Sequence, residues 1–291
     1  MTIYNLGSIN ADLVYRVPHL PGPGETLAST SHSRGLGGKG ANMSVAAARA
    51  GSHVAHIGAV GADGAWAVER LLEYGVDTRG IAVVGVPTGH AVIAVDDAGE
   101  NLILLCAGAN MSVGEADIAL ALKDAGPQDT FLFQNETNAG PFAAQQASAL
   151  GLRVAHVAAP FDAAAVAQVL PLLDLLVLNE VEAAQLVAAT GVALPDLPVR
   201  DIVVTLGAEG CRWHDTDTGT TREFAALPVT PVDTTGAGDT FTGYLLAGLD
   251  RGMPMAQAIG LAQRAAAIMV TRHGAADVIP DMKDVAESRF A

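Results

Sequence analysis

The sequence predicts an α/β protein built on a mostly parallel central β-sheet with helices on both faces. Half of the 291 residues are hydrophobic, so one domain can bury a large core. Charged residues make up 16% and aromatic residues 4%, a composition typical of helices packed tightly against a buried sheet. Short apolar segments alternate with amphipathic helical segments along most of the chain, which is the order that produces parallel strands and crossover helices.

The first elements follow in order from the N-terminus. The proline-rich PHLPGPGE interrupts extended apolar segments and marks a loop. Met43, Ala46 and Ala50 lie at helical spacing, and Gly51 ends that helix. The first part of the chain is predicted to contain strands at 3–6 and 13–17, a helix at 41–50, a strand at 54–59 and a helix at 65–74.

The pattern changes between residues 88 and 107. Two apolar runs, HAVIAV and NLILLC, are joined by the short connection DDAGE. This arrangement predicts a β-hairpin rather than a helical crossover. Together with extended segments near residues 12–34, the hairpin is expected to form a small separate sheet.

Strands and helices alternate again after the hairpin, and no internal repeat interrupts them. We therefore expect a single domain over residues 1–291. The remaining predicted elements are a helix at 113–123, a strand at 130–134, a helix at 141–150, strands at 153–158 and 175–178, a helix after Asn179, strands at 201–206 and 211–214, a helix after Gly238 and a long helix at 254–272.

Composition also limits the partners and the compartment. A formal net charge of -15 argues against nucleic-acid or anionic-membrane partners. Cys106 and Cys211 are far apart in sequence and form no C-x-x-C motif, which favours a reducing compartment. No stretch approaches the roughly 18 uninterrupted apolar residues of a membrane span. The sequence therefore predicts a cytoplasmic protein that binds neither nucleic acid nor membrane.

The glycine-rich GLGGKGAN, residues 35–42, resembles a nucleotide-binding loop. A dinucleotide fingerprint needs a buried strand before it and an acidic residue about 20 positions later. Here the preceding segment is rich in proline, and Asp63 lies beyond the next strand. A Walker A loop is excluded because Gly40 follows Lys39. Lys39 and Asn42 suit a hydroxyl-rich ligand, and the alternative is a simple glycine turn with a solvated lysine.

A second glycine motif, DTTGAGDTF, lies at residues 233–241 and precedes an apolar helix. Unpaired N–H groups at Gly236, Ala237 and Gly238 would converge on an anion and stabilise phosphate charge. The alternative is that Asp239 is only a helix cap and the glycines only a turn.

Two further motifs follow predicted strands. In NEVE, Asn179 and Glu182 have the spacing of a capping box, and they also stand where a magnesium ion could be bound at the end of a parallel strand. TLGAEG, residues 205–210, also ends a strand, and taken alone it predicts a turn. Both structural alternatives stay open at this point.

Taken together and in this order, GSINAD, GGKGAN, NEVE, TLGAEG and DTTGAGDTF resemble the ribokinase-like (PfkB) family of carbohydrate kinases over nearly the whole chain. The resemblance implies a three-layer α/β/α sandwich with a small β-sheet lid at about 12–34 and 88–107. It also implies transfer of the γ-phosphoryl group of ATP to a primary hydroxyl of a pentose, with D-ribose as the expected substrate. A fructokinase or a nucleoside kinase of the same family is the alternative. Homodimerisation through the lid and activation by Mg²⁺ and K⁺ are further implications.

The resemblance also assigns roles by position. Asp239 resembles the catalytic base, with Gly236, Ala237 and Gly238 as the anion hole. Asn10, Asp12, Gly38, Lys39, Asn42 and Glu136 would hold the sugar. Asn179, Thr205, Gly207, Ala208, Gly210 and Gln263 would line the nucleotide. Asn179 and Glu182 would organise Mg²⁺, while Asp233, Thr235, Met269, Arg272 and Gly274 match the position of K⁺.

Two features depart from the family pattern. The segment 194–199 is short and broken by prolines where relatives carry a helix, so one edge of the sheet is expected to be less covered. Val157 stands where ribokinases commonly have asparagine, which leaves strict ribose specificity open. Outside this class, two alternatives are a dinucleotide-dependent oxidoreductase and a sugar-binding regulator without catalytic activity.

Overall fold

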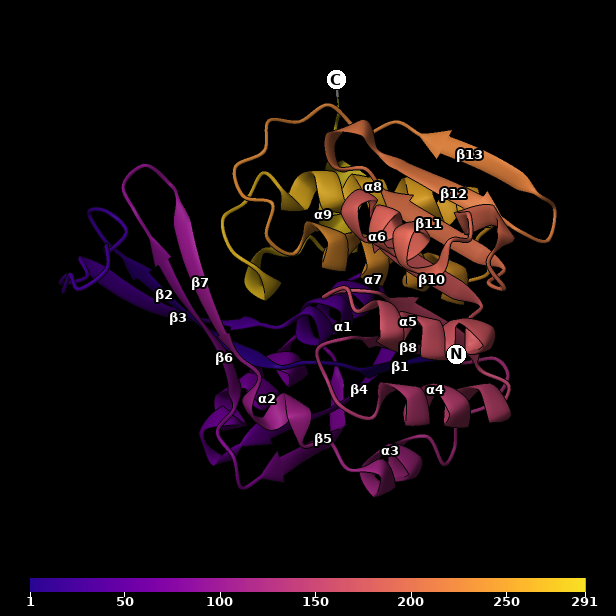
Figure 1. Cartoon of the computed structure of the whole chain (residues 1–291), viewed down its shortest axis with the longest axis horizontal. Coiled ribbons are helices and arrows are strands. Elements are labelled where there is room, and N and C mark those ends of the chain that lie inside the picture. The colour runs from indigo at the N-terminus through magenta and orange to yellow at the C-terminus, as the bar shows by residue number, and fades with distance from the viewer. Residues whose placement is uncertain (291) are drawn as a thin grey trace.

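A computed structural model describes residues 1–290 and contains two β-sheets (Figure 1). The larger sheet has nine strands in the order β13-β12-β11-β10-β9-β8-β1-β4-β5, parallel except for the antiparallel β12 and β13 at one edge. Their bounds are β1 (Thr2–Leu6), β4 (His53–Gly61), β5 (Asp77–Val84), β8 (Thr130–Gln134), β9 (Arg153–Val157), β10 (Leu175–Asn179), β11 (Asp201–Thr205), β12 (Cys211–Asp215) and β13 (Thr220–Phe224).

Helices cover both faces of this sheet and create two hydrophobic cores. Strand β10 shows the principle, because Leu175 and Val177 enter one core while Leu176 and Leu178 enter the other. The predicted α/β class is confirmed. One face carries α1 (Lys39–Arg49), α2 (Ala65–Glu73), α7 (Ala237–Asp250), α8 (Met255–Met269) and α9 (Met282–Glu287), and the other α3 (Glu115–Ala121), α4 (Gly140–Ala149), α5 (Ala163–Val169) and α6 (Glu180–Thr190).

The smaller sheet has the order β3-β2-β6-β7 and projects from one side of the main body (Figure 1). Its strands are β2 (Asn10–Arg16), β3 (Ser31–Gly37), β6 (Gly89–Val95) and β7 (Asn101–Cys106). The predicted hairpin is confirmed as the antiparallel pair β6–β7, and β2 joins β6 in parallel. The edge strand β7 exposes Ile103 (55%), Leu104 (62%) and Leu105 (58%).

Four elements are absent from the sequence prediction: β5, α5, β13 and α9. Strand β13 pairs with β12, and its sequence TTREF offers almost no apolar pattern. Helix α5 has only seven residues, and its N-cap Asp162 is its clearest local signal.

Among residues 1–290, no helix has both the length and the apolar character needed to cross a lipid bilayer. Short 3-10 turns are η1 (Ala62–Gly64), η2 (Gly108–Met111), η3 (Leu170–Leu172), η4 (Leu194–Asp196), η5 (Gly207–Glu209) and η6 (Ala276–Val278).

The segment between α6 and β11 forms only the single turn η4, as its prolines predict. A groove of about 440 Å³ remains there, lined in part by Val187, Leu194, Val204 and Leu206. Ile202 and Val204 of β11 are nevertheless buried, at 0% and 3%, so the missing helix leaves a groove rather than an exposed sheet face.

Candidate functional site

The loops that follow β1 and β8 meet where the strand order of the large sheet reverses. Strand β1 lies between β4 and β8, and such a switch point is where open α/β sheets bind ligands. The Ser8 hydroxyl, after β1, donates a hydrogen bond to Oε2 of Glu136, after β8. The backbone N–H of Lys39 donates to the same oxygen at 3.1 Å. Glu136 and the start of α1 thus share one side of a polar site.

Asn10 is buried on β2 and is held in one orientation by Asn110. The Asn110 amide donates to Oδ1 of Asn10 at 2.7 Å, and its own oxygen accepts from the backbone N–H of Ile9 at 2.9 Å. Asn110, in the turn after β7, was not predicted from the sequence. It links the beginning of the small sheet to the end of its hairpin.

Asp12 lies two residues further along β2, on the same face as Asn10. Its pKa is raised to about 6 by burial, and the nearby carboxylates of Glu136 and Asp239 raise it further. Gly37 on the neighbouring strand leaves the space for this side chain, because a Cβ at Gly37 would overlap the Asp12 carboxylate. Three acidic predicted site residues are therefore close enough to influence one another.

Asp239 is buried in the first turn of α7 and faces the first turn of α1. The Asn42 amide nitrogen donates to its Oδ2 at 2.8 Å. The two helices can approach this closely because α7 carries Gly243, where a Cβ would come within 2.5 Å of the Ala46 side chain. Burial raises the pKa of Asp239 to about 6, although Lys39 and Asn42 oppose the shift.

Lys39 is the cation of this acidic cluster. Burial by itself would lower its pKa, but the carboxylates of Asp239, Glu136 and Glu182 outweigh burial and raise it. The ammonium group therefore stays protonated across the neutral range. Gly38, the N-cap residue of α1, precedes it directly. The structure thus brings together residues from GLGGKGAN, NEVE and DTTGAGDTF, namely Lys39, Glu182 and Asp239.

The N-terminus of α7 offers free hydrogen-bond donors. Gly236 is its N-cap in the left-handed conformation, and no side chain caps the helix. Ala237 N–H bonds to the Thr234 carbonyl, whereas no protein acceptor within residues 1–290 reaches the N–H groups of Gly236, Gly238 or Asp239. Such a helix end attracts an anion. Asp239 is not the cap of its own helix, so the interpretation of Asp239 as only a helix cap is wrong.

A buried polar network lies beneath the backbone at the start of α1 and was not predicted. The Asn5 amide donates to the Gly40 carbonyl and to Ser44 Oγ, each at 2.8 Å. Ser44 Oγ contacts Nδ1 of His56 at 2.8 Å, and Nε2 of His56 lies 3.1 Å from the Gly7 carbonyl. Burial lowers the His56 pKa to about 4, so the ring is neutral near pH 7. Polar residues within apolar strands, such as Asn5 in IYNL, are the sequence signal that could have indicated this network.

Asn179 and Glu182 form the capping box at the start of α6. Asn179 N–H donates to Glu182 Oε2 and Glu182 N–H donates to Asn179 Oδ1, both at 2.8 Å. The structural interpretation is confirmed, and it leaves the second Glu182 oxygen available. Burial raises the pKa of Glu182, while Asn179 N–H and Lys39 oppose the shift. Glu182 is therefore one of the three carboxylates that act on the pKa of Lys39.

The nucleotide residues predicted in TLGAEG lie where β11 ends. Thr205 is the last residue of β11, Gly207 and Ala208 lie in η5, and Gly210 connects this turn to β12. The Gln263 amide on α8 donates to the carbonyls of Phe224 and Ala225, at 3.0 and 3.1 Å. Gln263 thus anchors the segment that leaves β13.

The residues predicted for K⁺ lie in two loops joined by Asp233. Its carboxylate accepts from Thr235 N–H at 2.9 Å and from Gly274 N–H at 3.1 Å. Burial alone would raise the pKa of Asp233, but these N–H groups lower it below the ordinary value. The Met269 carbonyl accepts from Arg272 N–H at 3.0 Å. Within residues 1–290, no hydrogen bond reaches the carbonyls of Thr235, Arg272 or Gly274.

Comparisons with known proteins agree with this geometry. The pfkB family carbohydrate kinase model matches residues 2–282, so the chain belongs to this family and is a carbohydrate kinase. A ribokinase of Haemophilus influenzae is 36% identical over 304 residues, which cover 98% of this chain and 97% of the relative. Cryptococcus neoformans ribokinase in complex with ADP has a TM-score of 0.82 at 33% identity, covering 98% of both chains. Arabidopsis thaliana ribokinase complexed with ribose and ATP has a TM-score of 0.85 at 27% identity, covering 98% and 97%.

Proposed function

We propose that this kinase phosphorylates D-ribose at its 5-hydroxyl with ATP. The observation that carries the proposal is the buried Asp239 carboxylate, which lies beside Asn42 at a helix N-terminus whose N–H groups include three without an acceptor in residues 1–290. A carboxylate in this position can accept a proton, and the N–H groups next to it can stabilise a phosphoryl group. The relatives that are ribokinases supply the choice of ribose.

In this mechanism Asp239 accepts the proton of the sugar 5-hydroxyl as that oxygen attacks the γ-phosphorus of ATP. The pKa of about 6 leaves Asp239 mostly ionised at pH 7, yet basic enough to take a proton. The N–H groups of Gly236 and Gly238 bind the oxygens on which charge develops, with Ala237 between them. Most of the catalysis comes from positioning and charge stabilisation.

The sugar lies between the small sheet and the start of α1. Carboxylates and amides are suitable partners for vicinal hydroxyls. Oδ1 of Asn42 is buried without a hydrogen-bond partner within residues 1–290, so it can accept from a sugar hydroxyl. The full set of sugar ligands in this proposal is Asn10, Asp12, Gly38, Lys39, Asn42 and Glu136.

The nucleotide extends from the α7 N-terminus toward the loop 205–210, with Gln263 supporting the segment beside it. No group of three or more His, Cys, Asp or Glu side chains within residues 1–290 could hold a metal ion unaided. Mg²⁺ commonly takes one or two protein carboxylates together with substrate phosphates and water, so the free oxygen of Glu182 and the side chain of Asn179 fit it. The ion would neutralise charge on the phosphates.

A monovalent cation fits the two loops joined by Asp233. Within residues 1–290, the carbonyl oxygens of Thr235, Arg272 and Gly274 have no hydrogen-bond donor, and the Met269 carbonyl lies at the end of α8, before the second loop. K⁺ favours such oxygen ligands, and a cation there would support the backbone next to Gly236. This assignment of K⁺ is part of the proposal.

We expect a homodimer that forms through β7 of the small sheet, which would act as a lid over the sugar. The support is its unpaired edge with a row of exposed apolar side chains, Leu102 to Leu105. An exposed apolar edge strand is a template for pairing with a second chain.

A coupled ADP-release assay tests the function. We expect ribose to give the highest kcat/KM in a panel that also contains deoxyribose, fructose, tagatose and nucleosides, and Asp239→Asn to abolish the signal. A higher kcat/KM with fructose or a nucleoside would change the assigned substrate but keep the kinase mechanism. These acceptors are included because Val157 stands where ribokinases commonly have asparagine. No ADP above background with any acceptor would refute the proposal.

A further inference from the structure

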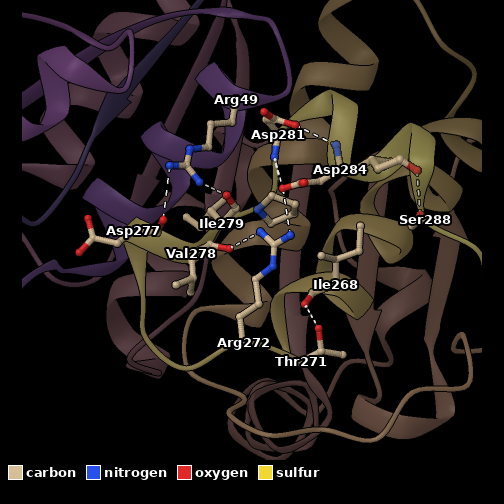
Figure 2. Close-up of polar contacts among 12 residues, drawn as sticks. Arg49, Ile268, Thr271, Arg272, Asp277, Val278, Ile279, Asp281, Asp284 and Ser288 are labelled. Atoms are coloured by element: carbon tan, nitrogen blue, oxygen red, sulfur yellow. Dashed lines mark hydrogen bonds and ion pairs between the residues drawn. The ribbon is translucent and has the colours of Figure 1, made fainter.

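The C-terminal strap, defined here as residues 276–281, is anchored on helix α1. The Arg49 guanidinium, in the last turn of α1, donates to the backbone carbonyls of Asp277 and Ile279 (Figure 2). Arg49 also stacks 4.6 Å above the Tyr74 ring. The helix that begins with the sugar residue Lys39 therefore ends on the strap.

A second anchor involves the side chain of Asp277. Arg70 on α2 donates to Oδ1 of Asp277 through Nε at 3.1 Å and through Nη2 at 3.0 Å, and the Tyr74 hydroxyl donates to the same oxygen. Charge-assisted hydrogen bonds from a guanidinium hold a carboxylate in a defined orientation. These contacts make the strap a fixed surface relative to α1 and α2.

Arg272 joins this fixed surface to the cation loop. Its Nη1 donates to the Val278 carbonyl at 3.1 Å, and its Nη2 pairs with Oδ2 of Asp284 at 3.0 Å (Figure 2). Both partners of the ion pair are about one third exposed, at 34% and 39%, so solvent screens the pair only in part. Arg272 thus spans from its own loop to the strap and to α9.

The loop that contains Arg272 is also held by hydrogen bonds to α8 and to residues 232–233. Helix α8 ends at Met269, and His273 and Gly274 are exposed. Thr271 and Arg272 N–H and the Thr271 hydroxyl bond back to α8. The Val270 carbonyl accepts from Val232 N–H at 2.7 Å and Asp233 N–H at 3.1 Å, and Gly274 N–H donates to Asp233. These bonds tie the loop to α8 and to residues 232–233, whereas the Arg272 side chain ties it to the strap and to α9.

We propose that Arg272 is a positioning residue for the monovalent-cation site: its guanidinium holds the carbonyls of 272 and 274 in place by bracing their loop against the strap. The inference rests on the cation site proposed above. The strap is held on α1 by Arg49 and limits the movement of this loop. The Asp233 carboxylate links the loop to Thr235, which precedes Gly236 at the N-terminus of α7. The side chain thus sets cation affinity without touching the cation or the substrates.

Thermal unfolding at fixed ionic strength tests this role without any turnover. A ligand that binds only the folded state stabilises it by RT ln(1 + [L]/Kd), so the Tm keeps rising with ligand concentration. A titration of KCl against choline chloride, fitted to this relation, gives the Kd of K⁺, which is its half-saturating concentration. We expect Arg272→Gln to raise that concentration by about fivefold or more, as expected when charge-assisted hydrogen bonds are lost. Asp284→Asn removes the same ion pair from the other side and should shift it in the same direction by less.

The matched control is Arg212→Gln. Arg212 bonds Glu223 between β12 and β13 at 2.8 Å, in a comparable exposed ion pair away from the strap. It should leave the K⁺ response unchanged. If Arg272→Gln lowered the Tm equally in both salts and kept the half-saturating K⁺ within about twofold of the wild-type value, the proposal would be refuted. Absence of a K⁺-specific Tm rise in the wild-type protein would refute both this role and the cation site, whereas ADP release with ribose would still decide the kinase function.

Discussion

Replacing Asp239 by asparagine should make the protein more stable and nearly inactive. The pKa of this carboxyl rises from 3.8 to about 6 on folding, chiefly through burial. A raised carboxyl pKa means that the folded state disfavours the charged form, so stability is lost as the pH rises from 3.8 through 6. The shift of roughly 2 units corresponds to a cost of about 3 kcal/mol at pH 8, falling to about 0.5 kcal/mol at pH 4.

Asparagine keeps the shape of the side chain and can still accept the hydrogen bond from the Asn42 amide. We therefore expect the Tm of Asp239→Asn to exceed that of the wild type by several degrees at pH 8, at roughly 2–4 °C per kcal/mol, and to match it near pH 4. Turnover should fall by about 10² to 10⁴, the usual contribution of a general base. Scanning calorimetry at both pH values and the ADP-release assay measure the two effects.

Asp63→Asn is the control of opposite sign. Thr88 donates to the Asp63 carboxylate through its N–H at 3.0 Å and its hydroxyl at 2.8 Å, and these bonds lower the pKa of Asp63. Its stabilisation is present above the unfolded-state pKa and lost as the pH falls through the lowered value, so this variant should be less stable than the wild type at pH 8. Unchanged turnover in Asp239→Asn would show that Asp239 is not the base. A Tm at pH 8 no higher than that of the wild type would show that burial of its charge costs no stability.

Three further changes test separate parts of the site. Gly37→Ala places a methyl group against the Asp12 carboxylate, so the KM for ribose should rise at least about tenfold while the KM for ATP changes little; equal changes in both would contradict the assignment of Asp12 to the sugar. Asn179→Ala removes the capping box with Glu182, which should cost about 1 kcal/mol by urea unfolding and raise the Mg²⁺ requirement; normal Mg²⁺ dependence in a destabilised protein would leave only the structural role. Leu104→Glu on β7 should convert a dimer to a monomer in light scattering, and a monomeric wild-type protein would rule out the proposed interface.

Local signals in the sequence predicted the elements that depend on local chemistry. The alternation of apolar and amphipathic segments identified the parallel sheet, and the spacing of Asn179 and Glu182 predicted a capping box that the structure contains. The short turn before β11 also followed from its prolines. In each case the decisive residues are neighbours in the chain.

Features that depend on tertiary packing could not be predicted in this way. The exposed strand β13 forms because β12 offers it a backbone partner, which no pattern in TTREF reveals. The pairing of Asn10 with Asn110 and the network from Asn5 through Ser44 to His56 join residues far apart in sequence. The roles of the glycine motifs were predicted from the resemblance to the PfkB family. The close approach of α1 and α7, which lets the Asn42 amide donate to the Asp239 carboxylate, is visible only in the fold.

Identification of the phosphorylated carbon tests the central claim most directly. After incubation with ATP, Mg²⁺, K⁺ and ¹³C-labelled ribose, NMR should show phosphorus coupling at C5 with stoichiometric formation of ADP. The signal should be absent with Asp239→Asn. Phosphorylation at another carbon, or the same product from the Asp239→Asn variant at the wild-type rate, would contradict a site built to present a primary hydroxyl to Asp239.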